Sequence, residues 1–220
     1  ILLSGSAELV AVSRQSGSVA FRRTFSGGQS HLFGQRAMRH ESELFVPANE
    51  EITVLPAAGG SPKRSLSLPE KSLTTPAWFE GSVVSVTNRG TVLVVDPTSG
   101  DVVKQIDTPA VQPVAVKPAI SGNRAVFADR RGRVVAVDLG AGAVAWDHSV
   151  GSQGVFQDVV LADGGVYLVA GSTLHALSIE DGSPIFEAIS GVSSLPLVRN
   201  GKLYYGRTAA GSTGGESDQA

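Results

Sequence analysis

Acidic side chains at the ends of aliphatic runs are the first residues of this chain that could do chemistry. Asp96 and Asp138 each end such a run and could act as a general acid or base. Both precede a glycine, Gly100 or Gly142, by four residues. An Asp in that place can hydrogen-bond the backbone two residues further on, so the shared spacing favours turn capping over catalysis.

Histidine and serine offer no clearer catalytic pattern. The histidines are His31, His40, His148 and His175, and no two have the spacing of a metal-binding pair. His175 lies inside an aliphatic run, where a hydrogen-bonded structural imidazole is the ordinary finding. No Gly-x-Ser-x-Gly motif supports a serine nucleophile. Cysteine is absent, which excludes disulfides, thiol catalysis and cysteine-based zinc sites, so we predict no catalytic and no metal-binding residues.

Two glycine-containing segments resemble nucleotide-binding motifs. Residues 140–145 read Gly-Ala-Gly-Ala-Val-Ala, but a dinucleotide site needs a helix next, with its N-terminus at the pyrophosphate. The segment continues instead as a strand-like run that reaches Trp146. Gly201 and Lys202 lack the upstream glycine of a phosphate-binding loop. We therefore expect turns at both places and no cofactor.

A long-range repeat explains these glycines. Five of them are separated by 43, 40, 42 and 40 residues, a period typical of propeller blades or solenoid units. They are Gly17, Gly60, Gly100, Gly142 and Gly182. A glycine at the end of such a turn adopts a positive φ without strain.

Short strands surround each repeated glycine. The runs before it are aliphatic and too short for a helix, which indicates strands buried on both faces: 9–13, 52–56, 92–96, 134–138 and 174–178. Four residues after the glycine, three copies carry an aromatic side chain and two carry a cation: Phe21, Trp146 and Phe186, then Arg64 and Lys104. The aromatic residue at this place is therefore a packing preference.

Two more strands can be placed before the hairpin. First-strand candidates are 76–81 and 195–201, and second-strand candidates are 82–86, 125–128, 166–169 and 203–205. Four short strands in about 40 residues are the arrangement of a propeller blade. We predict an all-β propeller of four-stranded antiparallel blades, with about five blades visible. A larger ring, of which these blades are a part, is the alternative.

The expected domain covers residues 1–210, and 211–220 form a Gly/Ser-rich flexible tail or linker. Its blades are expected at 1–25 (partial), about 37–66, 74–107, 115–149 and 156–188, and 191–208 (partial). Ile1 is not an initiator methionine, so we expect further residues upstream in the natural protein.

Composition narrows the expected partners. The formal net charge is −2, which provides no electrostatic footprint for nucleic acid. No apolar run approaches the roughly 18 residues that a membrane-spanning helix needs. We expect neither nucleic-acid binding nor direct membrane insertion.

The best repeat resembles those of the quinoprotein-like (PQQ-type) β-propellers. It runs from Val126 through an Ala-Val-Asp strand end and Gly142 to Trp146. Residues 82–100 match the pattern well and 164–186 match fairly, whereas the first two copies have Ser13 and Pro56 where Asp is expected.

This resemblance implies one of two functional classes. Quinone-dependent dehydrogenases use much longer eight-bladed rings, a calcium site and often adjacent cysteines. Envelope propellers such as the outer-membrane protein assembly lipoprotein are non-catalytic and bind a partner subunit through loops. The short chain without cysteine or an evident acidic cluster favours a periplasmic or otherwise extracytoplasmic scaffold, with outer-membrane association through a segment outside this chain. A dehydrogenase fragment and a ligand-sensing propeller module remain alternatives.

Arginines are the candidate partner-binding residues. Arg89 and Arg131 each stand eleven residues before their repeated glycine, which places both in turns on one face of the disc, with Arg130 beside the second. Arginine is enriched at protein interfaces and pairs bidentately with carboxylates. The loop 26–40, with His31 and Arg36, is long for a strand connection and is expected to border the same surface.

Overall fold

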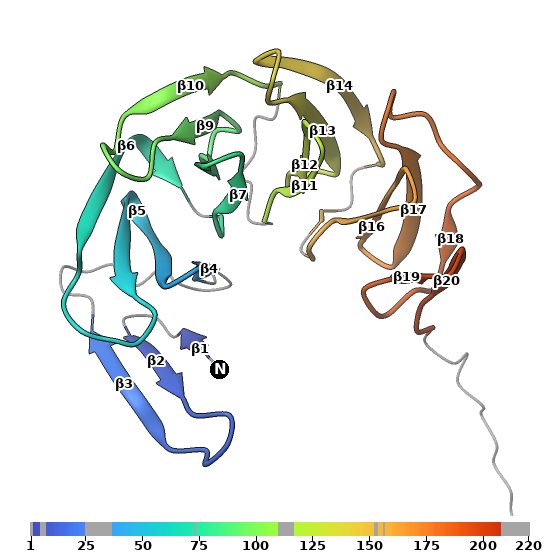
Figure 1. Ribbon diagram of the computed structural model, residues 1–220. Helices are drawn as coiled ribbons and strands as arrows, with labels where there is room; N and C mark the ends of the chain where they lie inside the picture. Colours follow the sequence, from blue (N-terminus) through green and yellow to red (C-terminus); the bar gives the residue numbers. More distant parts are fainter. Residues whose placement is uncertain are drawn as a thin grey trace, which may run out of the picture.

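The computed structural model describes residues 2–4, 8–24, 37–72, 74–109, 117–151, 154–155 and 157–207. Within these ranges all regular elements are strands, arranged in six antiparallel sheets. The sheets follow one another around an arc that is open on one side (Figure 1). We number them as blades I to VI in chain order. The predicted all-β fold with four-stranded antiparallel blades is confirmed.

Blades III, IV and V each have four strands in sequence order. Blade III consists of β7 (Ala77–Phe79), β8 (Ser82–Val86), β9 (Val92–Val95) and β10 (Val102–Ile106). Blade IV consists of β11 (Ala119–Ser121), β12 (Arg124–Ala128), β13 (Arg133–Asp138) and β14 (Ala143–Ser149). Blade V consists of β15 (Val160–Ala162), β16 (Gly165–Ala170), β17 (Thr173–Ser178) and β18 (Ile189–Ser190). The first strand β11 contacts both β7 and β15, so first strands line the inside of the arc.

Blade II contains a hairpin inside a single long element. Its strands are β4 (Met38–His40), β5 (Glu43–Pro56) and β6 (Arg64–Ser72). A straight strand as long as β5 would span about 45 Å. The N–H of Ala57 nevertheless donates to the carbonyl of Ser42 at 2.7 Å, so the chain reverses within β5. Asn49, with a φ of 58°, lies midway, and β5 thus supplies both the second and the third strand of this blade.

The terminal blades have fewer strands. Blade I contains β1 (Leu2–Ser4), β2 (Glu8–Val12) and β3 (Val19–Thr24), with Gly17 between the last two. These strands correspond to the second, third and fourth strands of the other blades. Blade VI contains β19 (Leu197–Arg199) and β20 (Lys202–Tyr204), which correspond to a first and a second strand.

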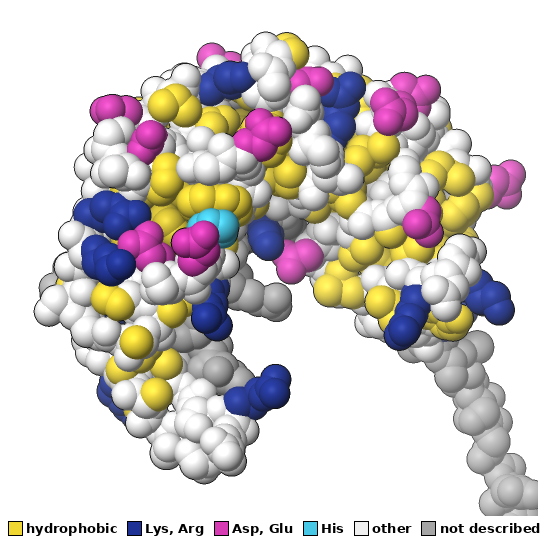
Figure 2. Space-filling view, in the orientation of Figure 1, with side chains coloured by type: hydrophobic (Ala, Val, Ile, Leu, Met, Phe, Trp, Pro, Cys, Tyr) yellow, Lys and Arg dark blue, Asp and Glu magenta, His cyan; other side chains and the backbone are white. Residues whose placement is uncertain are grey.

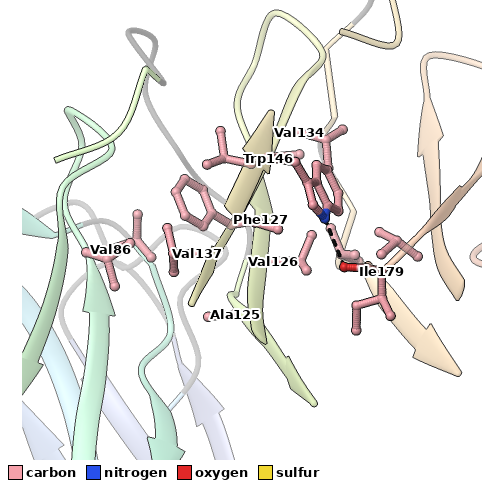
Figure 3. Packing of buried hydrophobic residues seen from close by; sticks show 14 of the residues in the cluster. Val86, Ala125, Val126, Phe127, Val134, Val137, Trp146 and Ile179 are labelled. Atoms are coloured by element: carbon pink, nitrogen blue, oxygen red, sulfur yellow. Dashed lines mark hydrogen bonds between the residues drawn. The ribbon is translucent and has the colours of Figure 1, made fainter. Parts of the chain in front are cut away.

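The hydrophobic core lies within and between blades. All four residues of β9 are buried, because a middle strand of a blade is covered by neighbouring blades on both faces. Figure 3 shows the packing around blade IV, where Phe127 and Val137 lie near Val86 of blade III. Burial of these aliphatic strands stabilises the stack of blades, at about 25 cal/mol for each square ångström removed from water.

Candidate protein-binding face

The antiparallel order of the strands gives each blade two different ends. Turns between second and third strands lie at one end, which we call the arginine face. Turns between third and fourth strands, which contain the repeated glycines, lie at the other end, the glycine face. Arg89 lies in the turn between β8 and β9, and Arg131 in the turn between β12 and β13. The two arginines therefore occupy equivalent turns of neighbouring blades.

A buried side chain holds each of these turns. In blade III, Thr87 Oγ1 accepts hydrogen bonds from the N–H groups of Arg89 at 3.3 Å and Thr91 at 3.1 Å. In blade IV, Asp129 Oδ1 accepts from the N–H groups of Arg131 at 2.8 Å and Arg133 at 3.0 Å. Thr87 is fully buried and Asp129 is 1% exposed. Short local bonds of this kind fix the backbone, so both turns present their arginines from a firm base.

The arginine side chains differ in their surroundings. Arg89, Arg130 and Arg131 are exposed. Arg133, half-buried beside them, forms an ion pair with Asp147 of β14. The exposed cations of the two turns are thus available at the surface, whereas Arg133 helps to hold β13 and β14 together.

A cleft of about 460 Å³ opens on the inside of the arc. Residues at the starts of first strands line it, among them Arg39, Trp78, Lys117 and Asp158. Ala119 at the start of β11 pairs with Val126 near the end of β12, so first strands begin at the arginine end. Arg39 and Lys117 are exposed, and Figure 2 shows Lys and Arg side chains along the hollow side of the arc.

The rest of the predicted loop lies partly beyond this surface. His31 and Arg36 fall outside the described residues. His40 ends β4, where its ring stacks on Trp78 of blade III with centroids 3.6 Å apart and planes 13° apart. Trp78 also meets Phe45 at 5.8 Å. His40 therefore contributes to the contact between blades II and III.

On the glycine face, the two candidate carboxylates cap turns. Asp96 Oδ1 accepts from the N–H groups of Thr98 at 2.6 Å and Ser99 at 2.9 Å, and these bonds lower the pKa of Asp96. Asp138 Oδ1 accepts from the N–H of Ala141 at 2.8 Å, which is the main cause of its lowered pKa. Its other oxygen pairs with Arg124. Hydrogen bonds to the ionised form explain both shifts, because they stabilise the carboxylate.

The same face carries a contact between blades that the repeat alone did not reveal. Trp146, four residues after Gly142, donates its indole N–H to the carbonyl of Ile179 in blade V at 2.9 Å (Figure 3). Lys104 Nζ donates to the carbonyls of Leu139 and Gly140 in blade IV. In the same way, Arg64 Nε of blade II donates to the carbonyl of Pro97 in blade III.

The acceptors of this contact share one place in the repeat. Pro97, Leu139 and Ile179 each stand three residues before their repeated glycine. Tryptophan, lysine and arginine therefore perform one task, which is to donate to the turn of the next blade. The available signal was that all three side chains are N–H donors at one offset. Phe21 cannot donate, and it packs instead against Gly59 of blade II.

Two general features of the described chain bear on function. Among the residues that the structure describes, no group of three or more His, Asp or Glu side chains could hold a metal ion. The described ranges also contain no helix with the length and apolarity required to cross a membrane.

Comparisons with known proteins agree with this architecture. The family model of the outer membrane protein assembly factor BamB matches residues 5–215. The structure of BamB from Moraxella catarrhalis has a TM-score of 0.65 and 18% sequence identity, over 84% of this chain and 60% of that one. The computationally designed Ika8 protein has a TM-score of 0.64 and 19% identity, over 78% of this chain and 54% of its own. These likenesses to solved structures concern the fold. A search of curated proteins found no match.

The chain thus spans about 60% of the length of the BamB structure. The family match covers nearly all of the sequence, including all the described blades. The chain therefore belongs to the family of the outer membrane protein assembly factor BamB.

Proposed function

We propose that this protein is a non-enzymatic scaffold of the bacterial cell envelope that binds another protein during outer-membrane protein assembly. The observation that carries the proposal is the family match over residues 5–215. Its relatives' name refers to assembly rather than to a reaction. An extracytoplasmic location, with outer-membrane association, is part of the same proposal.

The arginine face is the proposed binding surface. Arg89, Arg130 and Arg131 are exposed on firm turns of two neighbouring blades. Arg39 and Lys117 add positive charge at the cleft on the same end. A surface of this charge fits an acidic segment of the partner, because the guanidinium group pairs with a carboxylate through two parallel hydrogen bonds.

Charge reversal tests this surface. In the double variant Arg89→Glu and Arg131→Glu, we expect co-purification with other subunits of the outer-membrane protein assembly machinery to fall at least tenfold, as measured by quantitative mass spectrometry. Arg14→Glu is the matched control, because Arg14 is an exposed arginine in a turn of blade I on the glycine face. Equal recovery of the machinery by the double variant and the control would contradict the proposed surface.

The inner cleft favours one second candidate, a ligand-sensing propeller module. Its volume of about 460 Å³ is sufficient for a small molecule, and Trp78 provides an aromatic wall. Titration with a soluble quinone, followed by thermal shift and absorbance, separates the two functions. Saturable binding or dye-linked turnover would favour the second candidate, whereas no response is expected of a scaffold.

A further inference from the structure

The contact between blades IV and V contains a pair of histidines in an open pocket. His148 comes from β14, the fourth strand of blade IV, and His175 from β17, the third strand of blade V. Both line a pocket of about 510 Å³, together with Leu177, Phe186 and Glu187. Both imidazoles are partly buried.

The repeat shows what normally occupies these two places. His148 stands six residues after its repeated glycine, and His175 stands seven residues before the next one. Between blades II and III the same places hold Leu66 and Leu93, which are 1% and 0% exposed and share one hydrophobic cluster. Between blades III and IV they hold Ile106 and Val135, which are 3% and 0% exposed and also share a cluster. A titratable pair thus replaces an aliphatic pair in the contact between blades IV and V.

The fourth strand of blade V explains why this place is open to water. β17 pairs with β18 at Leu174 and Ile189, and pairing resumes only at Leu177 and Pro184. The register shifts by two residues across this break, whereas the corresponding shift in blades III and IV is one residue. The segment 186–188 therefore leaves the edge of β17 uncovered beside His175.

The charged groups around the pair are few. The pocket lining contains one carboxylate, Glu187, which is exposed on the segment 186–188. Asp147, next to His148 in β14, is paired with Arg133. On the other side of β17, Leu168 of β16 lies opposite His175. The attraction of an exposed carboxylate is weakened by water and salt, so it only partly offsets charge on the imidazoles.

Burial and the charge of His148 lower the pKa of His175. Desolvation disfavours the imidazolium form, and a second cation nearby disfavours it further. The folded protein therefore prefers neutral His175, whereas the unfolded chain protonates it at its ordinary pKa of 6.5. Stability is complete above that value and falls as the pH decreases below it.

We propose that His148 and His175 form a pH-sensitive joint between blades IV and V, which is closed when both imidazoles are neutral and loosened when they are protonated. The joint does not depend on the identity of any partner. Other contacts keep the blades attached, including the indole bond of Trp146 and the bond from Gly171 N–H to the carbonyl of Gly154 at 3.2 Å. Acid therefore loosens this contact without separating the blades.

Urea unfolding of the purified protein at pH 7.5 and pH 5.5 tests the joint. For the wild type, protonation of one such histidine lowers the folding equilibrium constant by up to about tenfold between these values, after subtraction of the effects shared with variants. The double variant His148→Ile and His175→Val restores the aliphatic pair of blades III and IV, and we expect it to lose this part of the pH dependence. His40→Phe is the control, because it removes a histidine from another contact between blades and keeps the ring stack on Trp78.

A second variant keeps the test valid if the aliphatic pair folds poorly. His148→Asn and His175→Asn remain polar but cannot be protonated, so they too are expected to lose the extra pH dependence. Hydrogen exchange is the second measurement, with faster exchange expected for amides of β17 at pH 5.5 in the wild type, after correction for the intrinsic effect of pH. An equal pH dependence in the wild type and both double variants would overturn the proposal. A loss of pH dependence in His40→Phe as large as that in the double variants would also overturn it.

Discussion

The indole N–H of Trp146 donates to the carbonyl of Ile179 at 2.9 Å, across the boundary between blades IV and V. Its ring also lies directly against Gly182, because a Cβ placed on that glycine would be 2.6 Å from Cε3 of the indole. One side chain thus secures the turn of the next blade by a hydrogen bond and by close packing. Lys104 and Arg64 make the hydrogen bond alone at the preceding two boundaries.

Replacing Trp146 by Phe is expected to lower the free energy of unfolding by about 1–3 kcal/mol. The ring remains, but the carbonyl of Ile179 loses its donor, and an unpaired buried polar group is costly. Trp146→Ala should cost about 3–5 kcal/mol, since the packing is lost as well. Urea unfolding measures both changes. Equal stability of the wild type and Trp146→Phe would show that the hydrogen bond contributes nothing.

Gly182→Ala separates backbone strain from close packing. Gly182 has a φ of 74°, and its substitution also places a methyl group against Trp146. Gly201→Ala is the matched control, since Gly201 has a φ of 65° and open space around its Cα. We expect a cost of about 1–2 kcal/mol for the control, from strain alone, and a further 1–3 kcal/mol for Gly182→Ala. Similar melting temperatures for the two variants would rule out the packing term.

Glu43 provides a prediction at acid pH. Hydrogen bonds from Arg64, at 3.0 and 2.8 Å, and from Lys63 lower its pKa to about 2, against an ordinary value of 4.5. The carboxylate is favoured in the folded state, so its contribution is complete above pH 4.5 and is lost as the pH falls towards 2. Glu43→Gln should therefore flatten the stability profile in this window. Measured unfolding profiles that fall in parallel would contradict this role.

Asp129 connects the stability of a turn to the proposed binding surface. Removing its carboxylate in Asp129→Ala leaves the buried N–H groups of Arg131 and Arg133 without an acceptor, and should cost about 1–3 kcal/mol. Asp129→Asn keeps an oxygen acceptor, and we expect it to retain most of that stability. If the turn presents Arg131 to a partner, Asp129→Ala should also weaken partner recovery more than Asp129→Asn. Recovery that is independent of the turn would separate Asp129 from binding.

Local patterns in the sequence were sufficient for much of the fold. The predicted second strand at 82–86 coincides with β8, and the predicted strand around 125–128 lies within β12. Asp96 and Asp138 accept the turn hydrogen bonds that their spacing from glycine implied. These features depend on residues close together in the chain, where side-chain type and spacing determine the outcome.

Other features depend on neighbouring blades. The reversal of the chain at Asn49 inside β5 has no glycine to mark it. Ser72, Thr74 and Ser85 form a buried hydrogen-bonded cluster between the end of β6 and β8, in which Ser85 Oγ donates to Ser72 Oγ at 2.8 Å. The polar residues of this cluster are inconspicuous in the sequence, because their partners lie on another blade.

The sequence by itself determined the period of about 40 residues, the all-β class and the turns closed by glycine, because each follows from short-range hydrogen bonding and patterning. Only the tertiary structure decided that Trp146, Lys104 and Arg64 perform one task, and that His148 meets His175. These contacts join side chains of one blade to the next. Their partners are set by how the blades pack, which no local pattern specifies.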